Sequence, residues 1–417
     1  MTRIRKRLAS ACVAVAAAAA INPVIAQTGE WTTRASPPDV LQESVLISLA
    51  DGRVIMAGGI LSAGRNTAAS AEVEVYDPSH DSWAQLPPMP APQYDATGAL
   101  LADGSVLIAG GEATLSAFAG APPVTNAVLF DPAKNTWTKL PPLPYAESGA
   151  TATLLDDGRI LLAGGADANS VLREAAIFDP ASRRWGLTSP MRMARIGAAA
   201  VLLKSGQVLV AGGFAGPGQP LRDAELFDPK KGTWRNTGSM TSLRRSPGAL
   251  ALPDGRVLVI GGLGVASAEF YDPSSGSWHE TTSMPISGQG QAFVLASGDV
   301  LAALINGSDR TIHSAVFKVQ TADWAVGPDL LVSSTYPPSE VQLADGAVLA
   351  VGGGTVAIFE NASVPPPTVA AAAAKVADSS TTTIVLATIF VLLALALGTL
   401  YLWRKRVQRA PSSGRVG

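Results

Sequence analysis

Short apolar runs, each closed by turn residues, recur along most of the chain. In residues 53–83 an apolar run ends at Gly58-Gly59, a polar loop follows, and an alternating run ends at Tyr76-Asp77-Pro78 before Trp83. Further double glycines follow at intervals of about 50 residues, and such a repeat with four strand-like runs per unit is typical of a propeller blade. The copies are Gly110-Gly111, Gly164-Gly165, Gly212-Gly213, Gly261-Gly262 and Gly352-Gly353, with Asn306-Gly307 where the remaining pair is due.

Each unit predicts four strands, a to d. Strand a, such as residues 44–49, is short and apolar, and a pair such as Asp51-Gly52 after it suits a two-residue type I′ hairpin. Strand b, such as residues 208–211, is apolar throughout and should be buried on both faces. Strand c alternates, as in residues 72–76, so one of its faces should meet water. After an Asp-Pro turn, strand d carries Trp83, Trp137, Trp185, Trp234, Trp278 and Trp324, whose rings can fill the wedge between splayed sheets.

The first and last units predict how the array closes. The last unit ends with strand c at Phe359-Glu360 and has no Trp of its own, whereas Trp31 precedes the first unit. We therefore expect an all-β, seven-bladed propeller over residues 27–361, in which the N-terminal strand supplies strand d of the last blade and removes the exposed sheet edges. Six blades are the alternative, if the unit with Asn306-Gly307 is an insert.

The double glycine, the Tyr/Phe-Asp-Pro turn and the Trp at fixed offsets resemble the kelch repeat, and the likeness covers nearly all of residues 29–361. The sixth unit departs from it, with Phe317-Lys318-Val319 in place of the turn. The resemblance implies a kelch propeller. It also implies that Arg, Ser and Tyr side chains near the d–a crossings surround the mouth of the channel, as in peptide-binding kelch domains.

Both ends of the chain predict membrane targeting. Residues 1–26 combine a basic start with an Ala-rich apolar run, which indicates a secretory signal peptide and favours a bacterial origin; an uncleaved anchor is the alternative. Residues 362–383 form a Pro/Ala-rich stalk. Residues 384–403 carry no charge, and as a transmembrane helix this segment is long enough to cross a bilayer. The basic tail, residues 404–417, should be cytoplasmic, with the propeller in the periplasm or at the cell surface.

Composition excludes several kinds of chemistry. The net charge is −2, and residues 27–362 are more acidic than the whole chain, so we expect no nucleic-acid partner. The only cysteine, Cys12, lies in the leader, which excludes the cysteine-linked copper chemistry of galactose oxidase-like propellers. His80, His279 and His313 fall in different blades without metal-ligand spacing. We expect no metal, no cofactor and no catalytic set of a known motif.

Differences between the repeats indicate where a partner would bind. The a–b and c–d turns are nearly uniform, whereas the b–c loops vary, from residues 60–70 in the first unit to 263–267 in the fifth. In antiparallel sheets these loops share one face with the d–a crossings, and variable loops on a rigid scaffold commonly carry recognition. The side chains predicted at this face are Tyr94, Asp95, Glu147, Arg173, Arg192, Arg195, Arg222, Arg244, Arg245, Gln289 and Tyr336.

The arginines of this set suggest a basic arc that could pair with a carboxylate or sulfate. Solvated arginines or ion pairs between blades are the alternative interpretation. The predicted function is binding of a protein or glycan by a membrane-anchored propeller, and the arginines favour an anionic ligand. The alternative is a carbohydrate-active enzyme of the sugar isomerase or mutarotase kind, with its site at the channel mouth and acid–base work by Glu147 with an Arg neighbour. A closed pocket with buried carboxylates would favour the enzyme, and a wide, shallow face would favour binding.

Overall fold

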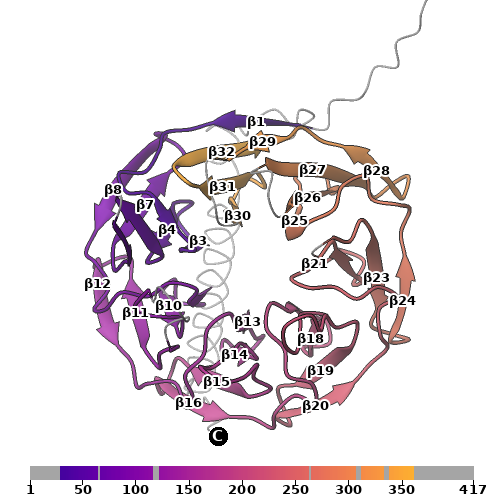
Figure 1. Cartoon of the computed structure of the whole chain (residues 1–417), viewed down its shortest axis with the longest axis horizontal. Helices are drawn as coiled ribbons and strands as arrows, with labels where there is room; N and C mark the ends of the chain where they lie inside the picture. Colours follow the sequence, from indigo (N-terminus) through magenta and orange to yellow (C-terminus); the bar gives the residue numbers. More distant parts are fainter. Residues whose placement is uncertain are drawn as a thin grey trace, which may run out of the picture.

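The computed structural model describes residues 29–360, except 64–65, 116–121, 263, 307–310 and 333–337. Regular structure within these residues consists of β-strands arranged in separate sheets that stand around a ring (Figure 1). No helix capable of crossing a membrane occurs in this part of the chain. The predicted signal peptide, stalk, transmembrane helix and tail lie outside the described residues and stay predictions.

The main sheets are antiparallel and share the order a-b-c-d from the centre of the ring outward (Figure 1). Strand a is innermost, and β3 contacts both β9 and β30 beside it. The a strands are Val45–Ser48 (β3), Thr97–Leu100 (β9), Thr151–Leu154 (β13), Ala199–Leu202 (β17), Gly248–Ala251 (β21), Gln289–Val294 (β25) and Ser339–Gln342 (β30). The b strands are Val54–Ala57 (β4), Val106–Ala109 (β10), Ile160–Ala163 (β14), Val208–Ala211 (β18), Val257–Ile260 (β22), Val300–Ile305 (β26) and Val348–Gly352 (β31).

The outer half of each sheet contains strands c and d. The c strands are Val73–Asp77 (β7), Ala127–Asp131 (β11), Ala175–Asp179 (β15), Ala224–Asp228 (β19), Ala268–Asp272 (β23), Thr311–Lys318 (β27) and Thr355–Glu360 (β32). The d strands are Ser82–Leu86 (β8), Thr136–Lys139 (β12), Arg184–Leu187 (β16), Thr233–Asn236 (β20), Ser277–Glu280 (β24), Asp323–Val326 (β28) and Glu30–Thr33 (β1). Outside this plan, Leu41–Gln42 (β2), Ile60–Ala63 (β5) and Asn66–Ala69 (β6) form a small sheet, and Leu330–Leu331 (β29) pairs with β27.

The a–b connections are three-residue loops, so the predicted two-residue type I′ hairpins are wrong. In the first sheet the Gly52 amide donates to the Leu49 carbonyl (3.1 Å), and the Leu49 amide donates to the Arg53 carbonyl (2.7 Å). Gly52 has a φ of 89°, whereas Asp51 has none of the positive φ that a type I′ turn requires. The Asp51 carboxylate instead accepts the Arg53 amide (3.1 Å), which favours a type I turn followed by a glycine bulge.

Strand b is buried on both faces, as predicted, but the prediction that strand c has a solvent-exposed face is wrong. All residues of β4 are buried, and so are the first four residues of β7, including Glu74, which is 0% exposed. Neighbouring sheets cover both faces of each sheet in the ring, so the alternation of strand c does not mark a solvated face. The polar positions of strand c must therefore find partners inside the protein.

The Trp of strand d packs against an aromatic ring of strand c in the same sheet. The ring centroids of Phe130 and Trp137 lie 4.8 Å apart, and both rings join a cluster that contains β3 and β4 of the preceding sheet. The Trp137 indole donates to the Pro87 carbonyl (2.8 Å). These rings fill the space between neighbouring sheets, as predicted from the sequence.

The N-terminal strand completes the sheet that contains the last strand. In Figure 1, β1 lies at the outer edge beside β32, and Trp31 is the partner of Phe359 in the antiparallel register. The two rings meet edge to face at 5.3 Å, and the Trp31 indole donates to Ser314 Oγ (3.0 Å) in the neighbouring sheet. The pairing predicted from the position of Trp31 is therefore present.

Candidate functional site

The b–c loops and the d–a crossings lie side by side on one side of the ring, which we call the loop face. Single β-bridges join a crossing residue to a b–c loop residue in several sheets. They are Tyr94 with Glu112, Ser148 with Ala166, Ile196 with Phe214, and Arg244 with Leu221. The two kinds of loop share a face, as predicted.

The double glycine at the end of strand b allows the crossing to approach closely. The Gly165 amide donates to the Arg195 carbonyl (2.9 Å), and the Gly213 amide donates to the Arg244 carbonyl in the same way (2.9 Å). A Cβ atom at Gly164, whose φ is 72°, would collide with the Arg195 carbonyl oxygen. The glycine pair therefore positions the residue four places before the next strand a, and we call that place the crossing position.

Arg195, at a crossing position, extends its side chain into the next sheet and is 1% exposed. Its Nη1 donates to the carbonyl oxygens of Gly212 (2.9 Å) and Asp223 (3.0 Å). Its Nη2 pairs with Glu225 Oε1 at 2.9 Å. Arg195 thus forms hydrogen bonds to one sheet through its backbone and to the next sheet through its side chain.

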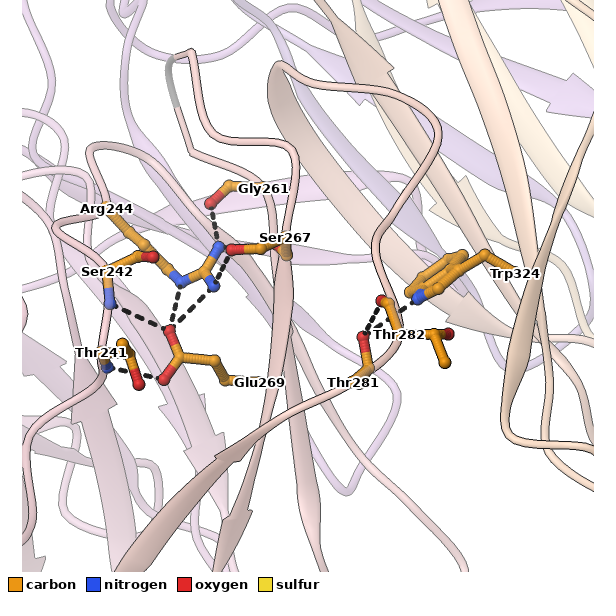
Figure 2. A network of polar contacts seen from close by, with 9 residues as sticks. All are labelled: Thr241, Ser242, Arg244, Gly261, Ser267, Glu269, Thr281, Thr282 and Trp324. Carbon is orange, nitrogen blue, oxygen red and sulfur yellow. Dashed lines mark hydrogen bonds and ion pairs between the residues drawn. The ribbon is translucent and has the colours of Figure 1, made fainter.

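Arg244 repeats this arrangement one sheet further on, as Figure 2 shows. It is 0% exposed, and its Nη1 donates to the carbonyl oxygens of Gly261 (2.6 Å) and Ser267 (2.7 Å). Its Nη2 pairs with Glu269 Oε1 at 2.9 Å. Glu269 also accepts the crossing amides of Thr241 (2.7 Å) and Ser242 (3.2 Å). A buried charge is tolerated only when it is paired and hydrogen-bonded, and both conditions hold here.

These contacts contradict the prediction of a basic arc for its two central members, Arg195 and Arg244. Arg195 and Arg244 have almost no exposed surface, so placing them in a ligand-binding site was wrong, and the alternative of ion pairs between sheets is right for both. The other predicted arginines, Arg173, Arg192 and Arg222, are exposed. Arg245 is exposed as well, and its guanidinium carbon lies 4.4 Å from the centre of the Phe214 ring.

The carboxylates of strand c that bond to residues of the crossings were not predicted from the sequence. Glu74, Glu225 and Glu269 occupy the second position of β7, β19 and β23, and all three are buried. The signal was a glutamate inside an otherwise apolar strand. Glu74 has no arginine partner because Leu41 occupies its crossing position, and its Oε1 accepts the Asp39 amide (2.9 Å) while its Oε2 has no partner. Burial raises the pKa of Glu74 to about 7.

Glu147 also occupies a crossing position, but with the opposite charge to Arg195 and Arg244. It is 0% exposed, its Oε2 accepts the Ala150 amide (3.2 Å), and its Oε1 has no hydrogen-bond partner. Burial raises the pKa of Glu147 to about 8. Because its side chain is enclosed, the predicted role of Glu147 as a surface binding or acid–base residue does not fit this structure.

A cavity of about 610 Å³ opens at the centre of the ring, between the inner strands and the ends of the crossings. Its wall includes Asp95, Gln289 and Glu340, so it contains two of the predicted site residues and one that was missed. Serine and glutamine side chains supply most of its other polar groups, namely Ser44, Ser246, Ser339, Gln291 and Gln342. The charged side chains among its lining residues are both acidic.

Burial and like charges shift the carboxyl groups at this cavity. Burial raises the pKa of Glu340 to about 8, although the Gln291 amide, which favours the charged form, opposes the shift. Burial and the charge of Glu112 raise the pKa of Asp95 to about 6. Glu43 lies close by, and burial together with Asp95 and Glu112 raises its pKa to about 7. These groups change protonation near neutral pH.

Two predicted residues remain. Tyr94 is buried with its hydroxyl donating to Glu112, so it supports the b–c loop of its sheet and does not line the cavity. Tyr336 falls outside the described residues.

Comparison with known proteins agrees with the repeats seen in the sequence. The Kelch motif matches residues 50–90 and 197–241. Beta-scruin of Limulus polyphemus is 30% identical over 138 residues, which are 33% of this chain and 14% of that protein. Kelch-like protein terF of Aspergillus terreus is 31% identical over 147 residues, 33% of this chain and 31% of that protein. The chain therefore matches less than a third of the length of either relative.

Solved structures support the fold over a larger part of the chain. A fungal alcohol oxidase of the AA5 family, in complex with copper, has a TM-score of 0.65 at 16% identity and covers 80% of this chain and 77% of its own. YjhT has a TM-score of 0.54 at 15% identity and covers 70% of this chain and 99% of its own. These likenesses concern the fold alone.

Sheets around a central channel define the class of β-propellers. With its kelch motifs, this protein is a kelch-repeat β-propeller. Among the described residues, no group of three His, Cys, Asp or Glu side chains is placed to hold a metal. His80 instead contacts Asp77 (2.7 Å), and His313 contacts Asp329 (3.1 Å).

Proposed function

We propose that this protein is a seven-bladed kelch propeller, tethered to a membrane with the propeller outside the cytoplasm, that binds a protein or glycan on its loop face. The central cavity of about 610 Å³ carries the binding part of the proposal. Its volume falls within the range of about 300–1,000 Å³ that is usual for ligand pockets. It lies beside b–c loops that differ from one sheet to the next, and kelch propellers commonly act as protein-binding modules.

The blade count and the tether rest on separate observations. Each of the seven a strands begins a sheet of the same order, and β1 supplies the outer strand of the last one. The tether rests on the sequence alone, through the uncharged residues 384–403 and the basic cluster after them.

Two measurements test these parts separately. For the tether, we expect the full-length protein to stay in the membrane fraction after carbonate extraction, with the propeller digested by protease added from outside. Release of the protein by carbonate would contradict the tether.

For the loop face, we propose pull-down from native membranes with Gln289→Trp at the cavity and Ser205→Trp as a matched control. Ser205 is exposed in an a–b turn on the opposite face. We expect partners to be lost with Gln289→Trp and kept with Ser205→Trp. Equal capture by the two variants would refute binding at this face.

A second candidate is the acid–base enzyme of the carbohydrate-active class. Asp95 and Glu340 favour it, because both line one cavity and the pKa of each is raised towards neutrality. Two-dimensional NMR exchange on reducing sugars would detect anomer interconversion by the full-length protein. Loss of the exchange cross-peaks in Asp95→Asn or Glu340→Gln would support an enzyme, and exchange no faster than in buffer would refute it.

A further inference from the structure

The central cavity has an acidic wall and acidic surroundings. Asp95 and Glu340 are the charged residues that line it, and Glu43 and Glu112 act electrostatically on Asp95 or on one another from close by. Glu147 lies near enough for Asp95 to raise its pKa, and its buried Oε1 has no hydrogen-bond partner. The charges that act on Asp95, Glu43 and Glu147 are thus those of other carboxylates.

No cation of the described part of the chain lines the cavity, and three arginines of the same face are engaged elsewhere, whereas Arg173, Arg192 and Arg222 are exposed. Arg195 and Arg244 are closed off in their ion pairs with Glu225 and Glu269. Arg245 lies over the Phe214 ring. The carboxylates of the cavity therefore lack the counter-charge that paired carboxylates have elsewhere in the ring, and bringing a cation to them would recover electrostatic energy.

The uncharged residues that line the cavity also offer hydrogen-bond acceptors. The amide nitrogen of Gln342 donates to the Val294 carbonyl, which leaves its Oε1 as an acceptor. Gln289 and Gln291 lie on β25 and line the same cavity. A side chain with several N–H donors could thus be held by carboxylate and amide oxygens together, and lysine and arginine are the protein side chains that carry such donors without any acceptor.

We propose that the cavity binds a lysine or arginine side chain presented by a partner protein. This inference rests on the proposed function and specifies its ligand: the partner is basic at the point of contact, in contrast to the anionic ligand that the sequence suggested. The overall acidity of residues 27–362 would draw such a partner toward the propeller.

The test uses the full-length protein in detergent and four short capped peptides. They are identical Gly/Ser peptides with a central lysine, arginine, norleucine or glutamate, and binding is measured by isothermal titration calorimetry. We expect the lysine and arginine peptides to bind at least about tenfold more tightly than the norleucine peptide. The glutamate peptide should not bind, and high salt should weaken the lysine complex.

Variants connect binding to the cavity. Asp95→Asn combined with Glu340→Gln should weaken the lysine peptide at least about tenfold. Asp156→Asn, on the exposed a–b turn of the opposite face, should leave binding unchanged. The double variant should melt no lower than the wild type, because glutamine avoids the cost of burying the charged Glu340 carboxylate and asparagine keeps an acceptor oxygen at Asp95. A loss of binding would then reflect the site and not unfolding.

Several outcomes would overturn the proposal. They are equal affinity for the lysine and norleucine peptides, an unaffected double variant, and tighter binding of a neutral oligosaccharide than of the lysine peptide. Binding of spermidine without either basic peptide would assign the cavity to free polyamines and refute a protein side chain. If Gln289→Trp still abolishes partner capture while the peptides fail, the proposed function stands and only its basic ligand is wrong.

Discussion

Replacement of Arg244 by methionine should destabilise the propeller more than any substitution of an exposed arginine. The change removes the guanidinium but keeps much of the apolar stem. It leaves Glu269 buried without its cation and leaves the carbonyl oxygens of Gly261 and Ser267 without the Nη1 donor (Figure 2).

The magnitude follows from these three acceptors. Removing one partner of a buried ion pair costs about 3–5 kcal/mol, mainly because the other charge stays buried. Each buried carbonyl left without a donor adds a desolvation cost of about 1–3 kcal/mol. Since neighbouring contributions do not add fully, we expect a loss of at least about 4 kcal/mol in the free energy of unfolding.

Urea unfolding followed by Trp fluorescence measures the global effect, and hydrogen exchange measures the local one. The amides of Thr241 and Ser242 donate to Glu269, so their exchange should accelerate in Arg244→Met if the carboxylate moves to find water. The amides of β4 lie in a distant sheet. Their exchange should accelerate only by the amount that the lower global stability accounts for.

Arg245→Met is the matched control, because it changes the adjacent residue, whose side chain is exposed. It removes a cation over the Phe214 ring and should cost only about 0.5–1 kcal/mol. If Arg244→Met proves no more costly than Arg245→Met, the ion pair does not connect the two sheets in the way that we infer.

Two further predictions concern stability. Burial raises the pKa of Glu74 to about 7 from its usual 4.5, so its contribution to stability is full below pH 4.5 and is lost as the pH rises through 7. The melting temperature should therefore fall between pH 5 and pH 8, and less steeply in Glu74→Gln; identical slopes would show that Glu74 does not titrate in this range. Deletion of residues 29–34 should lower the melting temperature markedly, because Trp31 is lost from its contacts with Phe359 and Ser314. An unchanged melting curve would show that β1 does not support the ring.

The fold was largely predictable because its determinants are local and repeated. Glycine pairs, Asp-Pro turns and Trp residues recur at similar places in most repeats, and the unpaired Trp31 predicted the strand partner of Phe359. The Asp-Gly turns show the limit of this approach. Two-residue and three-residue hairpins both favour Asp and Gly, and only the backbone bonds around Leu49 distinguish them.

The site was harder to predict because it depends on contacts between repeats. Arg195 and Arg173 look alike in the sequence, yet Arg195 meets a glutamate from the next sheet and Arg173 points to solvent. Glu340 was not identified because it lies in a short strand whose inward direction is fixed only by the closed ring. Opposite charges about 30 residues apart, at a crossing and in the following strand c, were the missed signal.

The pairing of β1 with β32 also has a consequence for how the chain folds. Arg34 and Glu360, which form an ion pair across this junction, lie 326 residues apart in sequence, whereas the other sheets are built from strands close along the chain. The early sheets can form as soon as their strands are made, but β1 must wait for the last strand before its edge is paired. Ring closure should therefore be a late and slow step of folding, and until it occurs β1 and β32 both expose edges on which two chains could associate.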